Sequence, residues 1–231
     1  YQIINILLNN NKKVILACQS DDDIEKDLKN INYSLYNIKN TYQDNIFLYK
    51  TEYDDIWVRD YGPQQLMKNI KNEYIFHKFK YNGYGKKYAY NKDILFAESI
   101  VNFYQNLVNK DIKDHKKIKL LALCEDLAIE GGNIINDGRC LIMNKNPLKM
   151  HNSLSWSKIY SILVKSFKRN NIEQYYTIDV DGLIGDDTDG HIDNLVRINN
   201  DKLLYMSIHD IHHPNYTRTK DLKIQLEEII N

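Results

Sequence analysis

The sequence predicts an α/β protein built from repeated small modules, and three observations support this fold class. Apolar stretches of strand length alternate with single amphipathic helices in a strand–helix–strand–strand order. Short polar clusters follow the strands, and no long structureless insert divides the chain. The 231 residues, of which 43% are hydrophobic and 27% charged, suit one large domain or two small ones able to bury a core.

The first part of the chain predicts two strands with a helix between them. Residues 12–18 form an apolar run after a basic start, which indicates a buried strand, and residues 45–49 indicate a second strand. Between them, Ser20 and Asp23 form a capping-box pattern at the start of a helix. The apolar stripe of that helix consists of Ile24, Leu28 and Ile31.

The middle of the chain predicts two hairpins around one helix and one strand. Residues 64–79 read as a hairpin, residues 94–108 as an amphipathic helix and residues 118–124 as a strand. Residues 134–142 predict a second hairpin, because Asp137-Gly138 is a strong signal for a tight turn.

The last part predicts further elements of both kinds. A helix over residues 156–167 is expected to be capped by Ser155, and a closing helix covers residues 219–230. The predicted strands are residues 174–180, 195–198 and 202–208.

An acidic cluster, residues 185–193, precedes the strand at 195–198 and has the sequence Gly-Asp-Asp-Thr-Asp-Gly-His-Ile-Asp. Carboxylates this crowded repel one another unless they meet a cation or donors. His191 and Asp193 are two residues apart, so on a strand both would project from the same face. An acidic surface loop and a calcium loop are the other interpretations. The calcium-loop pattern fails, because Gly185 occupies the first ligand position.

Two more polar clusters, residues 57–63 and 130–133, interrupt the strand pattern in a similar way. Together the clusters offer carboxylates, a flat aromatic face and a titratable base, which suit a planar cation such as guanidinium. The residues concerned are Asp60, Glu130, Asp193, Asp187, Trp57 and His191. Taken singly, each has a structural alternative, such as a local ion pair between Arg59 and Asp60 or a core position for Trp57.

Composition excludes several function classes. Lys plus Arg and Asp plus Glu both total 31, and this zero net charge argues against binding to nucleic acid. No apolar run is long enough to span a membrane and no signal peptide is visible, so we expect a cytoplasmic protein. The widely spaced Cys18, Cys124 and Cys140 indicate neither a disulfide framework nor a zinc site. The histidine-rich residues 209–214 fit a solvated loop better than a metal site, and we expect no metal or organic cofactor.

The three clusters resemble the agmatine deiminase family and its relatives, the Porphyromonas-type peptidylarginine deiminases. The matching segments are Trp-Val-Arg-Asp-Tyr-Gly-Pro at 57–63, Glu-Gly-Gly-Asn at 130–133 and the acidic cluster. Residues 79–88 also resemble the family's aromatic–Asn–Gly–aromatic–Gly segment. The resemblance runs in order from about Lys13 to the last residue.

The resemblance implies an α/β propeller with five-fold pseudosymmetry, the pentein fold, incomplete in this chain. It implies hydrolysis of agmatine to N-carbamoylputrescine and ammonia through a cysteine-bound amidino intermediate. Asp60 and Asp193 would bind the guanidinium, and His191 would transfer protons. Trp57 would line the pocket, Glu130 would support it, and Asp187 or Asp189 would read the far end of the substrate.

The chain departs from the family at the nucleophile, a cysteine in a C-terminal segment that ends in His-Cys. None of the three cysteines has that context, although Cys140 is an outside candidate. We therefore expect residues 1–231 to be a single catalytic domain that lacks its opening strand and helix and its cysteine segment.

Other functions stay open at this point. A deiminase of arginine or peptidylarginine, a non-catalytic guanidine-binding module and a metal-binding protein are the alternatives. An acidic distal pocket would favour the amine tail of agmatine. A homodimer is also left open.

Overall fold

The computed structural model describes residues 2–20, 45–66, 73–110, 117–199 and 202–230, and the chain divides into two compact units, residues 1–54 and 55–231. The single-domain organisation stays a prediction. The first unit contains α1 (Gln2–Asn9), which was not predicted, and the parallel strands β1 (Val14–Cys18) and β2 (Ile46–Lys50). Both predicted strands are confirmed. The helix predicted after Ser20 lies outside the described residues.

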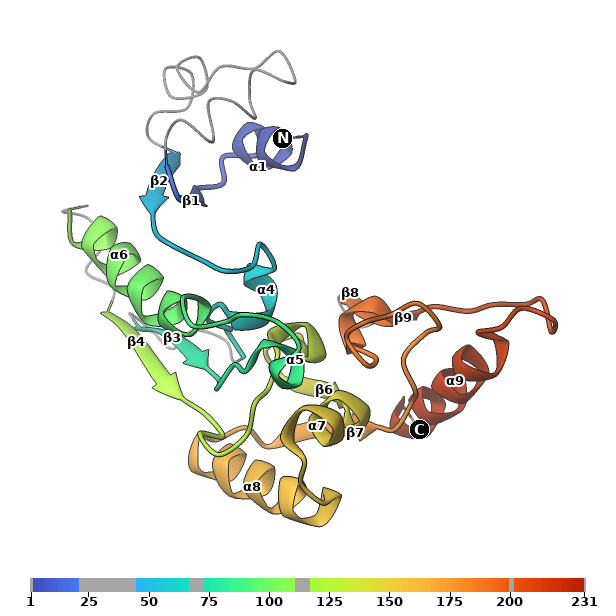
Figure 1. Cartoon of the computed structure of the whole chain (residues 1–231). Helices are drawn as coiled ribbons and strands as arrows, with labels where there is room; N and C mark the ends of the chain where they lie inside the picture. The colour runs from blue at the N-terminus through green and yellow to red at the C-terminus, as the bar shows by residue number, and fades with distance from the viewer. Residues whose placement is uncertain (1, 21–44, 67–72, 111–116, 200–201, 231) are drawn as a thin grey trace. The chain divides into compact units, whose positions relative to one another are not determined.

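The second unit begins with a two-stranded parallel sheet, β3 (Glu73–Lys78) and β4 (Lys117–Ala122). Parallel neighbours need a crossover. It contains α6 (Phe96–Lys110), which lies beside the sheet (Figure 1) and contacts Phe76 of β3 through the ring of Tyr104. The predicted helix is confirmed, with a leading turn η1 (Asp93–Leu95).

The hairpin predicted at residues 64–79 is confirmed only as one antiparallel bridge, between Gln64 and His77. The described partner strand of β3 is β4, about 40 residues further along the chain. Sequence patterning identified the apolar run of β3 but not this long-range pairing.

A three-stranded sheet follows, with β5 (Ile135–Asn136), β6 (Cys140–Asn144) and β7 (Gln174–Ile178) in that order. The predicted hairpin is confirmed, since Ile135 pairs antiparallel with Ile142 and Gly138 takes the positive φ of +80° that the turn requires. The crossover to the parallel strand β7 holds two helices, α7 (Lys145–Asn152) and α8 (Trp156–Arg169).

The main core of this unit lies under α8. Ile159, Leu163 and Phe167 recur at helical spacing and are fully buried. Each contributes roughly 1.5–3 kcal/mol by leaving water. Ser155 is the N-cap residue, as predicted by position, but its hydroxyl makes no capping bond to the backbone. It contacts the hydroxyl of Ser157 instead.

The last strands, β8 (Val196–Asn199) and β9 (Lys202–Tyr205), are antiparallel and precede the closing helix α9 (Tyr216–Ile230). Leu222 and Leu226 of α9 pack in a second core with Ile178 and Val180 at the end of β7. The predicted strands and helix are confirmed here, with β9 shorter and α9 longer than expected.

Three short helical turns lie in or at the end of the polar clusters: α4 (Val58–Tyr61), η2 (Gly131–Asn133) and η3 (Ile192–Asn194). A fourth, α5 (Gly83–Lys86), lies in the segment 79–88. The prediction that His191 and Asp193 share a strand face is wrong, because His191 is the N-cap of η3 and the strand starts at Val196. Gly190, with a φ of +97°, turns the chain just before them.

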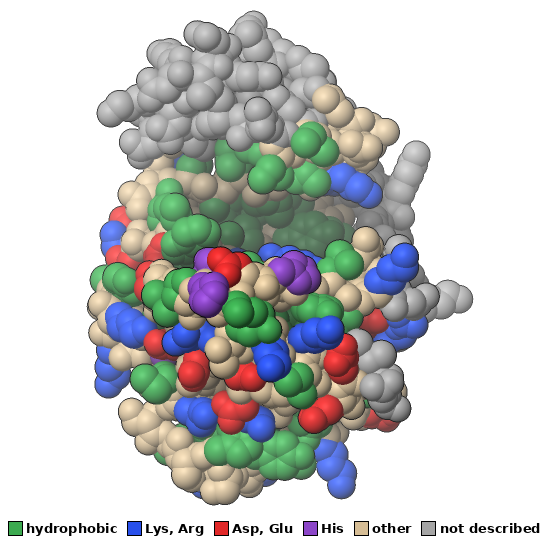
Figure 2. All heavy atoms as spheres, turned by 90° about the vertical axis from the view of Figure 1, so that its right-hand side faces the viewer, with side chains coloured by type: hydrophobic (Ala, Val, Ile, Leu, Met, Phe, Trp, Pro, Cys, Tyr) green, Lys and Arg blue, Asp and Glu red, His purple; other side chains and the backbone are tan. Residues whose placement is uncertain are grey.

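The mixed α/β class is confirmed, while the incomplete propeller with five-fold pseudosymmetry stays a prediction. Figure 2 shows basic and acidic side chains intermixed over one face, in agreement with the balanced composition. Within the described residues, no helix combines the length and the hydrophobicity needed to cross a membrane.

Candidate active site

The side chains of Asp60, His191 and Asp193 converge over the glycine turn η2. The N–H of Gly132 donates a 2.7 Å hydrogen bond to Asp60 Oδ1. A Cβ on Gly132 would lie 2.4 Å from Asp60 Oδ1, 2.6 Å from His191 Nδ1 and 3.2 Å from Asp193 Oδ2. Polar atoms from three parts of the chain therefore surround one point, and only glycine leaves room for them.

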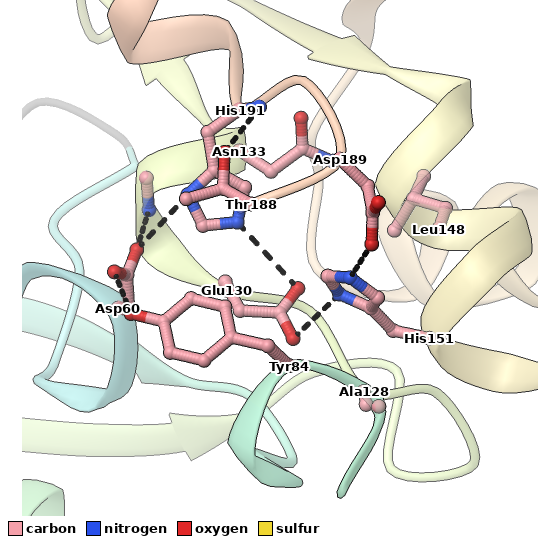
Figure 3. A network of polar contacts seen from close by, with 12 residues as sticks. Asp60, Tyr84, Ala128, Glu130, Asn133, Leu148, His151, Thr188, Asp189 and His191 are labelled. Carbon is pink, nitrogen blue, oxygen red and sulfur yellow. Dashed lines mark hydrogen bonds and ion pairs between the residues drawn. The ribbon is translucent and has the colours of Figure 1, made fainter. Parts of the chain in front are cut away.

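Asp60 is fixed through both of its oxygens although it lies on a helix of a single turn. Gly62 ends α4 by donating its N–H to the carbonyl of Val58 over 2.8 Å, and the buried side chain of Asp60 turns inward. Its Oδ2 accepts a 2.6 Å hydrogen bond from the hydroxyl of Tyr84. Its Oδ1 lies 3.4 Å from His191 Nδ1 (Figure 3). The position of this carboxylate is therefore defined before any ligand binds.

Arg59, next to it, has a structural place. Its guanidinium donates to Gln64 Oε1 over 2.7 Å and to the carbonyl of Ile134 over 2.6 Å. Its Nε lies 3.9 Å from Asp193 Oδ2. These contacts join α4 to Ile134, which precedes β5, and give Arg59 a structural role.

The loop that presents His191 is organised by Asp186. Its Oδ1 accepts hydrogen bonds from the N–H and the hydroxyl of Thr188, and its Oδ2 accepts from the N–H of Gly190. The Thr188 hydroxyl oxygen in turn accepts the N–H of His191 over 3.1 Å. The carboxylate of Asp186 therefore accepts hydrogen bonds from its own loop. Through Thr188, these bonds fix the backbone position from which the His191 side chain extends.

Asp193 lies in an environment that disfavours its charge. Burial raises its pKa above the usual value, and the nearby charge of Asp60 adds to the increase, while His191 and Arg59 act in the opposite direction. A bound cation would lessen this repulsion, because its positive charge would attract both carboxylates.

A cavity of about 790 Å³ opens over these groups, within the range of small-molecule sites. Its lining combines carboxylates, aromatic rings and apolar side chains, the combination that binds a cation with an aliphatic stem. The lining includes Trp57, Arg59, Asp60, Tyr84, Tyr88, Ile184, Asp187, His191, Asp193 and Met206.

The other predicted residues take different places. Trp57 lines the cavity and is 62% exposed, and Asp187 lines it at the surface, where it accepts a 3.3 Å hydrogen bond from Tyr88. Glu130 is fully buried outside the lining, with Oε2 4.0 Å from His191 Nε2. Asp189 is also outside the lining, because its carboxylate contacts Lys87 and His151.

Sequence reasoning missed Tyr84, Tyr88 and His151. Tyr84 bonds to Asp60, and its ring centroid lies 5.8 Å from that of His191. Its φ of +56° is unusual for a non-glycine residue, which makes the position a strained one. The segment 79–88 drew attention by resemblance alone. Nothing local to His151 marked it, since α7 was not predicted.

The described residues that line this cavity include no cysteine. Cys18 and Cys124 are buried, and burial raises the pKa of Cys124 to about 11. Cys140 lies in a second cavity, of about 340 Å³, beside Asp137 and Arg139, and burial raises the pKa of its thiol as well. A thiol with a raised pKa is a poor nucleophile.

Comparisons with known proteins agree on one family for this chain. The model of the Porphyromonas-type peptidyl-arginine deiminase family matches residues 1–231. Agmatine deiminase of Ectopseudomonas mendocina is 28% identical over 206 residues, which cover 80% of this chain and 48% of that protein. The enzyme of the same name from Pseudomonas fluorescens is 28% identical over 184 residues, covering 75% and 45%.

The fold is similar to that of a substrate-bound C. jejuni agmatine deiminase, with a TM-score of 0.66 at 21% identity. The alignment covers 99% of this chain and 62% of the C. jejuni chain. The chain spans about half the length of the curated relatives that it matches.

Proposed function

Because the chain belongs to the Porphyromonas-type peptidyl-arginine deiminase family, we propose that its acidic cavity binds a small guanidine compound for hydrolytic deimination. One observation carries this proposal: Asp60, Asp193 and His191 surround a single point over Gly132. Two carboxylates on one side match the paired N–H groups of a guanidinium, and an imidazole beside them can move protons.

In the proposed reaction, a guanidinium and a water molecule yield a ureido product and ammonium. Asp60 and Asp193 hold the planar cation, and each oxygen that already accepts one hydrogen bond keeps a second acceptor site. Trp57 offers a flat, exposed face to the cation. Glu130 stands behind His191 and keeps its ring oriented.

His191 acts first as general acid and then as general base. A thiolate, as the resemblance implies, forms a bond to the guanidinium carbon, and the C–N bond to the leaving nitrogen breaks as His191 gives that nitrogen a proton. His191 then takes one proton from a water molecule, which attacks the amidino carbon and releases the thiolate. The second proton of that water passes to the departed ammonia, so that ammonium is the final product. Cys18, Cys124 and Cys140 do not line the cavity, so we assign the attacking sulfur to none of them.

Agmatine is the substrate that we propose, with N-carbamoylputrescine as the product. The cavity wall around Tyr88 carries Asp187, whose carboxylate suits a terminal ammonium group. The free carboxylate of arginine would need a cation there. The described basic side chain in the lining is Arg59, which lies against Asp193 at the guanidinium end. We propose the five-fold propeller for the fold, which the series of separate small sheets supports.

Calorimetric titration tests the binding step. The protein should bind agmatine and bind putrescine, which lacks the guanidinium, at least about tenfold more weakly. Asp60→Asn should lose the preference, whereas Asp221→Asn, an exposed acid on α9, should keep it. Equal affinity for both ligands would contradict the proposal.

A guanidine-binding module without catalysis is the second candidate, favoured by the lack of a cysteine among the described lining residues. Ammonia release separates the two functions. A catalyst turns over many equivalents of agmatine, and a binding module releases none while it retains its affinity. Comparing arginine and a peptidylarginine in the same assay identifies the preferred tail.

A further inference from the structure

Figure 3 shows Glu130, His151 and Asp189 in a continuous series of polar contacts beside His191. His151 stands in its middle. Its Nδ1 lies 3.0 Å from Glu130 Oε1 and its Nε2 lies 2.9 Å from Asp189 Oδ2. Asp189 also accepts a 2.6 Å hydrogen bond from Lys87. The series therefore runs from an exposed lysine through two carboxylates and one imidazole.

The hydrogen bonds define the protonation state of His151. An ionised carboxylate only accepts hydrogen bonds, so an imidazole between two carboxylates must donate from both nitrogens. With both carboxylates ionised, both ring nitrogens carry hydrogen and His151 is a cation. Its side chain is only 1% exposed, and that of Glu130 is fully buried, so water does not provide the partners.

The surrounding charges agree with this state. Glu130 and Asp189 are the two anions that face His151, and Lys87 balances Asp189 from the far side. Tyr84 presents its ring edge-on to the imidazole, 6.3 Å between centroids. Burial alone would lower the pKa of His151, but the hydrogen bonds and charges of the two carboxylates outweigh burial and raise it.

His151 determines which oxygen of Glu130 faces the candidate active site. Oε1 of Glu130 is occupied by His151, whereas Oε2 has no hydrogen-bond partner among the described residues. Oε2 lies 4.0 Å from His191 Nε2, which is also buried and also without a partner there. A buried carboxylate is strongly destabilising unless it is paired, and His151 supplies the pairing.

We propose that His151 is a positioning residue for the proposed deimination: as a buried cation it holds Glu130 so that the second oxygen of Glu130 faces the imidazole of His191. This inference rests on the proposed function only for its catalytic consequence. The charge state of His151 and its hold on Glu130 belong to the folded protein whether or not it is a deiminase.

Titration of isotope-labelled histidine side chains by NMR tests the charge state in the unaltered protein. We expect His151 to keep both ring protons to a higher pH than an unperturbed imidazole, whose pKa is about 6.5. The histidines of the urea-unfolded protein provide the reference titration. If His151 lost its proton at the same pH as the unfolded histidines, or at a lower pH, the proposal would be overturned.

Kinetics of His151→Gln test the consequence. We expect kcat to fall about tenfold or more, as part of the 10²–10⁴-fold that a general acid–base residue contributes, with KM for agmatine within about twofold. His212→Gln should leave both constants unchanged. Unaltered kcat in a folded His151→Gln protein would overturn the proposal, as would a rise in KM without a fall in kcat.

A second variant covers the case in which His151→Gln does not fold. Asp189→Asn keeps the contact between His151 and Glu130 but removes the negative charge at residue 189. His151 should therefore lose its proton at a lower pH than in the wild type. An unchanged titration would count against the proposal. If the wild-type protein releases no ammonia from any guanidine, the proposed function fails, while the two titrations still decide the role of His151.

Discussion

Gly132→Ala is the substitution that most directly tests how the site is assembled. The added Cβ would lie 2.4 Å from Asp60 Oδ1 and 2.6 Å from His191 Nδ1, where ordinary contacts are about 3.5–4.0 Å. Both side chains are buried, Asp60 accepts a hydrogen bond from Tyr84, and His191 Nδ1 lies 3.4 Å from Asp60 Oδ1, so neither side chain can move without disturbing a contact. Overpacking of this kind lowers the free energy of unfolding by about 1–3 kcal/mol.

The same overlap displaces the two groups proposed to meet the guanidinium. We expect affinity for agmatine, measured by calorimetry, to fall at least about tenfold, which corresponds to about 1.4 kcal/mol. Gly138→Ala is the matched control. Gly138 has a φ of +80° in the β5–β6 turn, so alanine at this position lowers the free energy of unfolding by about 1–2 kcal/mol. Gly138 does not line the cavity. Urea unfolding should show similar losses for both variants, with affinity reduced only in Gly132→Ala. Wild-type affinity in Gly132→Ala would refute this account of the site.

Four further predictions concern charge and thiol chemistry. Asp193→Asn should weaken agmatine binding by about 2–5 kcal/mol and yet raise the Tm at neutral pH. The folded protein raises the pKa of Asp193, so the ionised carboxylate destabilises the folded state at a pH above that raised pKa. Asparagine removes this destabilisation. The stabilisation from His151 is complete below the unfolded pKa of about 6.5 and is lost as pH rises through the raised folded pKa. Urea unfolding between pH 6 and 9 should therefore show a steeper loss in wild type than in His151→Gln. A thiol reagent should label Cys124 only after unfolding, since its pKa is about 11. Cys140→Ser should leave agmatine affinity unchanged, and a change would show that this thiol reaches the site.

Local sequence signals predicted most elements because their causes are local. The hairpin at residues 134–142 follows from an Asp-Gly turn, and α8 follows from apolar residues at helical spacing. The pairing of β3 with β4 could not be predicted, because patterning identifies a strand but not its partner. The helix α7 was missed since its eight residues contain Pro147 and a mostly polar surface.

The candidate site divides in the same way. Residue types in three short clusters indicated a guanidinium site, and Asp60, His191 and Asp193 do converge. The argument used for two of them was wrong nevertheless, because His191 precedes a helical turn. What brings them together is the hydrogen bonding of Asp186 and the space left by Gly132.

The sequence by itself determined the chemistry available: the acids, the aromatic face and the imidazole, together with the local turns and helices that carry them. Tertiary structure alone decided which of these groups share one environment. It directs Asp189 away from the cavity toward His151 and leaves Asp187 at the rim, although the two acids are neighbours in one loop. Burial and charge pairing act through space between residues far apart in the chain, so no reading of local pattern could have assigned those roles.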